Sequence, residues 1–171
     1  PALGGLVLRC ANSAYFAPVS TITTVQQAVA YLGHITVRNL VVSASAQSLL
    51  SRALRGYGLP RCGLWRHALA VATGAHIAAR HYEPALADVA YHAGLLHDLG
   101  KLALDPLLPE SEEPLPSAAN AAVPAAVTLE LERALLGTDH AEVGAEIARG
   151  WNLPAGLAEC IAFHHEPQRG A

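Results

Sequence analysis

Residues 64–81 read LWRHALAVATGAHIAARH, and this stretch decides the class of fold. Its apolar positions recur at helical spacing, and small side chains dominate it from Ala68 to Ala79. The side chains at a contact set how closely two helices approach, so a helix of small residues packs tightly on its neighbours. We therefore expect a buried central helix here, and it carries His67.

The composition extends the helical prediction to the whole chain. The chain has 171 residues, enough for one domain with a real core or for two small halves that share one. Alanine, the best helix former, occurs 34 times. Apolar residues make up 52% of the chain and charged residues 15%, which excludes a disordered chain. No segment shows sustained strand alternation, so the sequence predicts an all-α protein.

Capping and turn residues divide the chain into further helices. Thr23 or Thr24 can cap a helix that Gly33 ends, and Asp139 reads as the cap of a later helix. The expected helices cover residues 3–11, 25–32, 35–54, 64–81, 86–102, 128–136, 141–151 and 154 to about 167.

Breaks between these helices suggest how the chain is organised. Two glycines and a proline interrupt it between residues 56 and 60. We expect an N-terminal helical part over residues 1–58, truncated at its start, and a core over residues 59–171. Residues 105–124 hold five prolines and three glutamates and read as an exposed loop. The chain opens in mid-pattern without an initiator methionine, so we expect a fragment of a longer protein.

Charge, cysteine content and hydropathy exclude several classes of function. The net charge is −3, so the chain lacks the basic footprint of a protein that binds a nucleic-acid polymer. The three cysteines are widely spaced, which argues against a disulfide framework or a thiolate zinc site and favours a reducing cytoplasm. No window holds about 18 consecutive apolar residues and no signal peptide is present, so we expect no membrane partner.

Nine histidines are many for a chain with few other polar side chains, and five of them join one aspartate in a suggestive order. These imidazole and carboxylate groups are the candidate metal ligands: His67, His97, Asp98, His140, His164 and His165. Such a set suits Mn, Fe, Zn, Ni or Mg, and the identity of the metal stays open. The carboxylate of Asp98 can bridge two cations, so we expect one or two divalent ions; paired cations activate water for attack on a phosphoester. Lys101, one turn beyond Asp98, could meet a phosphate oxygen.

Two parts of the chain resemble known families. The ordered histidines and the segment GLLHDLGK (94–101) are similar to the HD superfamily of metal-dependent phosphohydrolases, in particular to its HD-GYP branch of cyclic-dinucleotide phosphodiesterases. The segments LRCANSAYF (8–16) and ITTVQQAVAYLGHITVRNLVVSAS (22–45) resemble the HDOD (HD-related output domain) family. Together these resemblances cover Leu8 to Pro167. They imply an HD-domain-like helical bundle with an N-terminal helical HDOD sub-domain, in a bacterial signalling module that is often attached to sensory domains.

The chain departs from the enzymes of this superfamily at three points. No glycine-tyrosine-proline motif follows the His-Asp pair. Gly63 stands one turn before His67, where some HD-GYP members have a carboxylate. No aspartate follows His165, so the closing ligand is absent or lies downstream of Ala171.

Two functions remain open at this point. The first is a signal-transduction output module that retains a His/Asp metal site and acts through a protein partner or an attached signalling domain. The alternative is an active metal-dependent phosphohydrolase or phosphodiesterase that acts on a nucleotide or another phosphoester. In that enzyme Asp98 and Lys101 would be the catalytic residues.

Overall fold

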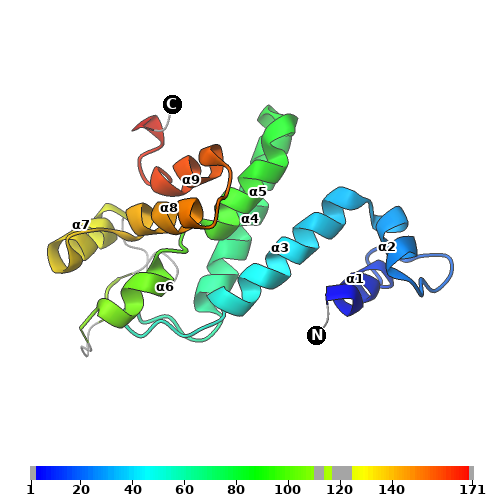
Figure 1. The fold of residues 1–171 in the computed structure, drawn as a ribbon, viewed down its shortest axis with the longest axis horizontal. Coiled ribbons are helices and arrows are strands. Elements are labelled where there is room, and N and C mark those ends of the chain that lie inside the picture. Colours follow the sequence, from blue (N-terminus) through cyan, green and yellow to red (C-terminus); the bar gives the residue numbers. More distant parts are fainter. Residues whose placement is uncertain (1–2, 110–113, 117–124, 170–171) are drawn as a thin grey trace. The chain divides into compact units, whose positions relative to one another are not determined.

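The computed structural model of the chain describes residues 3–109, 114–116 and 125–169. These residues are helical apart from turns and one isolated antiparallel β-bridge between Leu54 and Leu59, so the all-α prediction is confirmed (Figure 1). The chain divides into two compact units between Ser45 and Ala46. The sub-domain boundary expected after residue 58 stays a prediction.

The helices of the first unit begin and end at the residues that the capping pattern indicates. They are α1 (Leu3–Ala11), α2 (Val25–Leu32) and the beginning of α3 (His34–Leu50). Thr24 accepts the backbone N–H of Gln27, whose side chain accepts the N–H of Thr24, which makes a capping box. Gly33 ends α2 at φ 81°, a conformation that costs glycine little.

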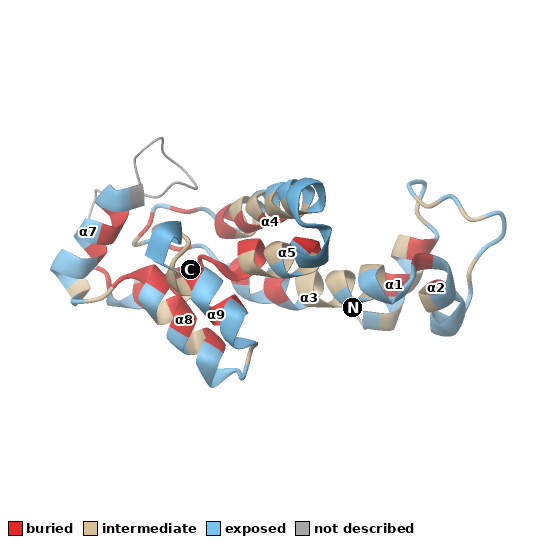
Figure 2. Cartoon of the chain, turned by 90° about the horizontal axis from the view of Figure 1, so that it is seen from above, coloured by how far each residue is buried: buried red, intermediate tan, exposed pale blue. Residues whose placement is uncertain are grey.

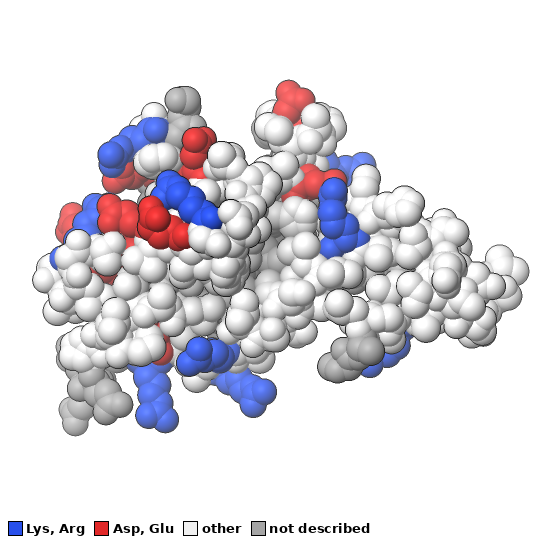
Figure 3. Space-filling view, viewed as in Figure 1, with Lys and Arg blue, Asp and Glu red and all other residues white. Residues whose placement is uncertain are grey.

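A small core and one asparagine hold the first unit together. The buried core residues are Val7, Ala11, Ala28 and Leu32. Asn12 Nδ2 donates to the carbonyl oxygens of Leu8 (3.0 Å) and Ile22 (2.8 Å), and its Oδ1 accepts the N–H of Ile22 at 2.8 Å. The side chain thus ties the end of α1 to the segment that leads into α2. Arg9 and Arg38 are the charged residues of this unit's sequence, and the face in Figure 3 is largely uncharged there.

Helix α3 ends at Leu50 rather than at the predicted residue 54. Leu54 and Leu59 exchange backbone hydrogen bonds of 3.0 and 2.9 Å, so the chain after the helix closes a tight turn. Gly58 sits in this turn at φ 61°, in the left-handed region that favours glycine. The predicted helix was too long because apolar spacing alone does not detect a turn that pairs two leucines.

The second unit is built around α4 (Gly63–Tyr82), and α5 (Ala87–Leu96) packs along it after a short 3₁₀ turn, η1 (Pro84–Leu86). Gly94 permits a close approach of the two helices, since a Cβ there would lie 2.7 Å from Ala72 Cα. The expected burial holds for the first half of α4, where Leu64, Ala68 and Ala72 are buried (Figure 2). From Thr73 onward the helix is exposed or half-buried, so burial of the whole helix was wrong.

The helix predicted over residues 86–102 is interrupted at the His97–Asp98 pair. α5 ends at Leu96, and a turn covers residues 97–100. The following elements are α6 (Lys101–Leu104) and the 3₁₀ turn η2 (Asp105–Leu107). In the turn, the N–H groups of Leu99 and Lys101 donate to carbonyls three residues back. This tighter winding redirects the side chains that follow α5.

Glycine at position 100 lets this turn pack directly on the start of a later helix. A Cβ on Gly100 would lie 2.0 Å from the carbonyl oxygen of His140, closer than any real contact. The turn after α5 and the first residue of α8 are therefore held backbone to backbone, which fixes the spacing between the side chains that each carries.

Three more helices complete the described part of the second unit. They are α7 (Ala125–Leu136), α8 (His140–Gly150) and α9 (Ala155–Ala162), followed by the 3₁₀ turn η3 (Pro167–Arg169). Asp139 caps α8 as predicted, because its Oδ1 accepts the N–H groups of Ala141 and Glu142, both at 2.9 Å. The last helix ends at Ala162, before the predicted residue 167.

Most of the predicted loop 105–124 lies outside the described residues, which omit 110–113 and 117–124. Among the described helices, none combines the length and the apolar character that crossing a membrane requires.

Candidate metal centre

Side chains from four separate segments of the second unit meet around one carboxylate. His67 comes from α4, His97 and Asp98 from the turn after α5, His140 from the first turn of α8, and His164 and His165 from the turn after α9. Asp98 is 1% exposed and lies at the middle of the group. All six candidate ligands predicted from the sequence are thus brought together, and their role as ligands stays a prediction.

The two oxygens of Asp98 face different histidines. On one side, Asp98 Oδ2 lies 3.4 Å from His97 Nε2 and 3.6 Å from His67 Nε2. On the other side, Asp98 Oδ1 lies 3.3 Å from His140 Nε2 and 3.9 Å from His164 Nε2. The carboxylate therefore separates two sets of imidazole donors.

Backbone carbonyls fix the orientation of two of these rings. His97 Nδ1 lies 2.8 Å from the carbonyl oxygen of Gly94, and His164 Nδ1 lies 2.7 Å from that of Ile161. A carbonyl oxygen can only accept a hydrogen bond, so each Nδ1 carries the proton. Each Nε2 then presents a lone pair toward Asp98, the arrangement of metal-binding histidines whose second nitrogen is anchored.

Glu132 of α7, which the sequence analysis missed, orients His140 in the same way. His140 Nδ1 lies 2.7 and 2.9 Å from the two oxygens of Glu132, and the backbone N–H of His140 donates to Glu132 Oε2 at 2.8 Å. The hydroxyl of Tyr57 donates to Glu132 Oε1 at 2.8 Å. Burial, together with the Glu132 charge, raises the pKa of Tyr57, so this hydroxyl keeps its proton and remains a donor.

A sequence signal for Glu132 existed. Glu132 is 0% exposed and shares the inward face of α7 with Leu129, three residues before it. A carboxylate in line with a buried leucine on an amphipathic helix needs a partner, since an unpaired buried charge is costly. Because a glutamate on the buried face of a helix is rare, its position would have identified Glu132 as a candidate functional residue.

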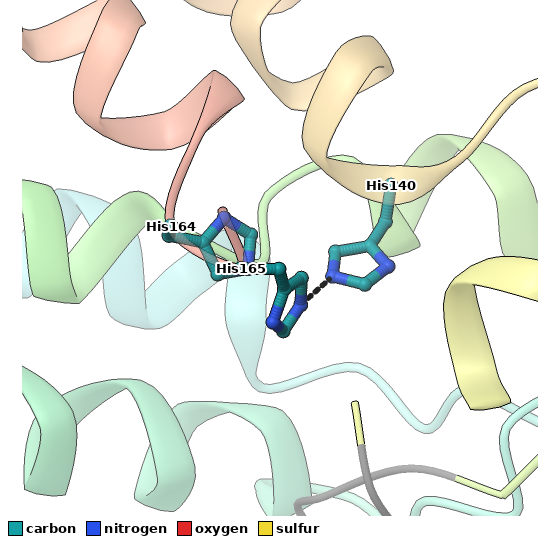
Figure 4. A group of neighbouring side chains, drawn as sticks. All are labelled: His140, His164 and His165. Carbon is teal, nitrogen blue, oxygen red and sulfur yellow. Dashed lines mark hydrogen bonds between the residues drawn. The ribbon is translucent and has the colours of Figure 1, made fainter. Parts of the chain in front are cut away.

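Figure 4 shows how the last two histidines approach His140. His165 Nε2 lies 2.9 Å from His140 Nε2. Because His140 holds its own proton on Nδ1 toward Glu132, the proton between the two rings belongs to His165. His165 therefore donates to His140 in this arrangement and binds a cation through Nε2 only after it gives up that proton.

The donor set fits a divalent cation. Two groups, His67 with His97 and Asp98 and His140 with His164 and His165, each keep their donor atoms within 4.8 Å of one another. Ligands bonded at about 2.1 Å to one ion lie about 3.0–3.4 Å apart. Several donors around Asp98 are spaced close to that range. Asp98 Oδ2 and His164 Nε2 are buried without a hydrogen-bond partner, whereas Asp98 Oδ1 has Lys101 Nζ at 2.8 Å. Neutral imidazole with carboxylate suits several first-row metals.

The electrostatics keep most of these groups in the form that binds a cation. Burial alone would raise the pKa of Asp98, but Lys101 and then His97 hold it well below its usual range. Burial, and then His165, lower the pKa of His164 to about 3. Burial lowers the pKa of His97 as well, but the neighbouring Asp98 outweighs it and the net pKa is raised. A cation that binds there displaces a proton.

Lys101 lies inside the cluster rather than at its mouth. Its Nζ is 2.8 Å from Asp98 Oδ1, and its side chain is 3% exposed. The ring of Tyr57 lies 5.9 Å from Nζ on another side. The role of Lys101 on a phosphate oxygen stays a prediction, and it requires the lysine to leave Asp98.

The helical bundle and this cluster define an all-helical module related to the HD superfamily. The chain matches the HDOD domain family over residues 1–167. It belongs to that family.

A curated protein and solved structures are similar to this chain. The chain is 31% identical over 169 residues to an uncharacterized protein of Treponema pallidum (strain Nichols), covering 93% of this chain and 30% of that protein. It is similar to the crystal structure of an HDOD domain protein of unknown function from Geobacter sulfurreducens, with a TM-score of 0.71 and 27% identity, over 97% of this chain and 54% of that one.

A second solved structure comes from Shewanella amazonensis and bears a provisional name as a phosphohydrolase. Its TM-score is 0.69 at 28% identity, over 98% of this chain and 57% of that one. The chain thus spans less than a third of its Treponema relative and a little over half of the two solved chains.

Proposed function

We propose that this chain is a signal-transduction output module of HDOD type that retains a His/Asp centre for a divalent metal ion. One observation carries the proposal. Three imidazole nitrogens with fixed lone pairs (on His97, His140 and His164) converge on the buried carboxylate of Asp98.

Such a convergence is electrostatically unfavourable without a cation. The lone pair of a neutral imidazole and a carboxylate oxygen repel each other at 3.3–3.9 Å. Protonated His97 can donate to Asp98 Oδ2, and a cation would displace that proton. Buried polar groups are normally hydrogen-bonded, and the exceptions concentrate at functional sites. A divalent ion between these atoms satisfies Asp98 and the rings together, as in other sites whose ligands are oriented by a second layer of hydrogen bonds.

The candidate ligands and the groups that orient them would have separate roles. His67, His97 and Asp98 Oδ2 would hold one ion, with the His97 ring oriented by the Gly94 carbonyl. On the other side, Glu132 orients His140 and the Ile161 carbonyl orients His164. A bound divalent ion supplies Lewis acidity and lowers the pKa of a coordinated water. His67, His164 and His165 are half-buried, so they form the part of the cluster that is partly open to solvent.

A cleft beside His165 would take the ligand or partner of such a module. It has a volume of about 730 Å³ and is lined by residues of α7, α8, α9 and the segment after α9, among them Leu129, Val143 and Phe163. Arginine and glutamate side chains also line it, and residues of both charges gather on this part of the second unit in Figure 3. This surface suits a phosphoester with an apolar group or a segment of an attached signalling domain.

The alternative function, an active phosphohydrolase that cleaves a nucleotide or another phosphoester, is supported by the two-sided use of Asp98. Each of its oxygens faces its own set of histidines. If two cations bound, the carboxylate would hold both of them, as in many phosphoester hydrolases. The Shewanella relative bears a phosphohydrolase name.

Metal content tests the first proposal. Purified protein is loaded with Mn²⁺, Fe²⁺ or Zn²⁺, freed of excess ion, and measured by mass spectrometry beside a His97→Ala/Asp98→Ala variant. The matched control is His81→Ala, an exposed histidine of α4 outside the cluster. Metal retained by the wild type and by His81→Ala but lost from the double variant supports the centre. No retained metal in the wild type rejects it, and hydrolysis of a generic phosphodiester by the loaded protein would favour the enzyme.

A further inference from the structure

Lys101 is the most unusual member of the cluster, because a lysine is almost never fully buried unless it is paired. Its ammonium group lies 2.8 Å from Asp98 Oδ1, and the side chains of Lys101 and Asp98 are 3% and 2% exposed. The two residues share one turn of the chain, three positions apart. The ammonium group thus lies against one oxygen of the carboxylate that the candidate ligands surround.

This contact makes the two donor groups around Asp98 electrostatically different. Asp98 Oδ2 is the oxygen next to His67 and His97. Among the described residues, no lysine or arginine lies within ion-pair distance of it. Asp98 Oδ1, next to His140 and His164, already carries the ammonium group. A second divalent ion on the Oδ1 side would have to displace Lys101 or lie beside it, and like charges at such distances repel strongly in a buried site.

The second donor group is also occupied by an internal hydrogen bond. His165 donates to His140 Nε2 at 2.9 Å, so that lone pair is engaged. In the first group, the Nε2 atoms of His97 and His67 lie farther from Asp98 Oδ2, at 3.4 and 3.6 Å. A cation on the His140 side therefore breaks two existing contacts, whereas a cation between His67, His97 and Asp98 Oδ2 breaks neither of them.

We propose that Lys101 serves as a built-in substitute for the second cation. The resting protein would then bind one divalent ion tightly, at His67, His97 and Asp98, and a second ion only weakly. This inference rests on the proposed metal centre and adds its stoichiometry. It also bears on the choice between the two functions. A lysine at the position of the second cation keeps the centre in a one-metal state, which suits binding rather than two-metal hydrolysis.

Metal stoichiometry tests the proposal on the full chain without any assay of activity. The variants are Lys101→Met, which removes the charge at similar length, and Lys101→Arg, which keeps it. The matched control is Arg80→Met, which removes an exposed charge from α4. Each protein is loaded with Mn²⁺ and dialysed, the bound equivalents are counted, and calorimetric titration gives the affinity of each step.

We expect one retained equivalent in the wild type, Lys101→Arg and Arg80→Met, and two in Lys101→Met. The second binding step should tighten about a hundredfold when the neighbouring charge is removed. Two retained equivalents in the wild type, or one in Lys101→Met, would overturn the role of Lys101. No retained metal in any variant would instead reject the metal centre itself, so the two failures are distinguishable.

Removal of the buried lysine leaves Asp98 without its ion pair, so Lys101→Met could fail to fold, which far-UV circular dichroism reports. Two histidine variants then decide the question with Lys101 in place. His67→Ala should lose the retained equivalent, because His67 belongs to the tight group, whereas His164→Ala on the opposite side should keep it. The reverse pattern would show that the tight ion lies on the Lys101 side and would overturn the proposal.

Discussion

Glu132→Ala removes the carboxylate behind the candidate centre and tests the network most directly. Glu132 is fully buried and accepts from Tyr57 Oη at 2.8 Å, from the backbone N–H of His140 at 2.8 Å and from His140 Nδ1 at 2.7 Å. A hydrogen bond to a charged group contributes about 1.5–3 kcal/mol, so three of them give an expected loss of at least about 4 kcal/mol. That loss approaches the total stability of a marginal domain, about 5 kcal/mol.

Glu132→Gln separates the stability effect from the effect on the centre. The amide keeps the shape and one acceptor oxygen, so the free energy of unfolding should fall by only about 1–3 kcal/mol. The bond to His140 Nδ1 weakens, however, and loss of such an orienting partner lowers the affinity for a cation bound by His140 about 10- to 100-fold, whereas the ion at His67, His97 and Asp98 should be retained. Urea denaturation followed by far-UV circular dichroism measures the first quantity, and competition with a chelator measures the second.

Glu130→Ala is the matched control, since Glu130 lies on the exposed face of the same helix. Its free energy of unfolding should stay within about 0.5 kcal/mol of the wild type. If Glu132→Ala were as stable as Glu130→Ala, the buried network of Tyr57, Glu132 and His140 would be refuted.

Three further predictions concern other parts of the chain. Gly100→Ala should destabilise the second unit by about 3 kcal/mol or more, because the added Cβ would meet the His140 carbonyl oxygen at 2.0 Å; an unchanged melting temperature would contradict that contact. In metal-free protein the folded pKa values of His164 and His165 are about 3 and about 4, below the ordinary 6.5, so the unfolded chain takes up protons that the folded chain does not. The free energy of unfolding should therefore fall as the pH drops from about 6.5 toward 4, and a His164→Asn/His165→Asn variant should flatten that slope; equal urea midpoints at pH 7.5 and 5 would count against it. Asn12→Ala should cost about 1 kcal/mol in thermal unfolding, since an exposed side chain loses hydrogen bonds that bridge α1 to the next segment, and no loss would show that this bridge is dispensable.

The sequence predicted the parts of this protein that local patterns control. Thr24 and Gly33 fix the ends of α2, and Asp139 caps α8, because capping is a matter of a few neighbouring residues. The ordered histidines of the resemblance likewise converge around Asp98.

Other features depend on contacts between distant residues and escaped local reasoning. The helix through residue 102 was predicted as continuous because its apolar spacing continues, whereas the turn at 97–100 exists through the approach of Gly100 to His140. Glu132 was missed since its partners Tyr57 and His140 are far from it in the sequence or come from another helix. The burial of Lys101 likewise reflects packing of several helices rather than its own neighbours.

The candidate ligands are spread along the chain from His67 to His165, at the ends of helices that meet only in the folded second unit. No short segment of the chain can form the centre by itself, so metal uptake and cooperative folding of this unit are thermodynamically linked. A bound ion would add its binding free energy to the stability of every helix at once. Conversely, a packing change far from the cluster, such as a larger residue at Gly94, would weaken metal retention by lowering the population of the folded unit. Metal occupancy would thus report the integrity of the whole unit, and any signal that loosens its helices would be read out as release of the ion.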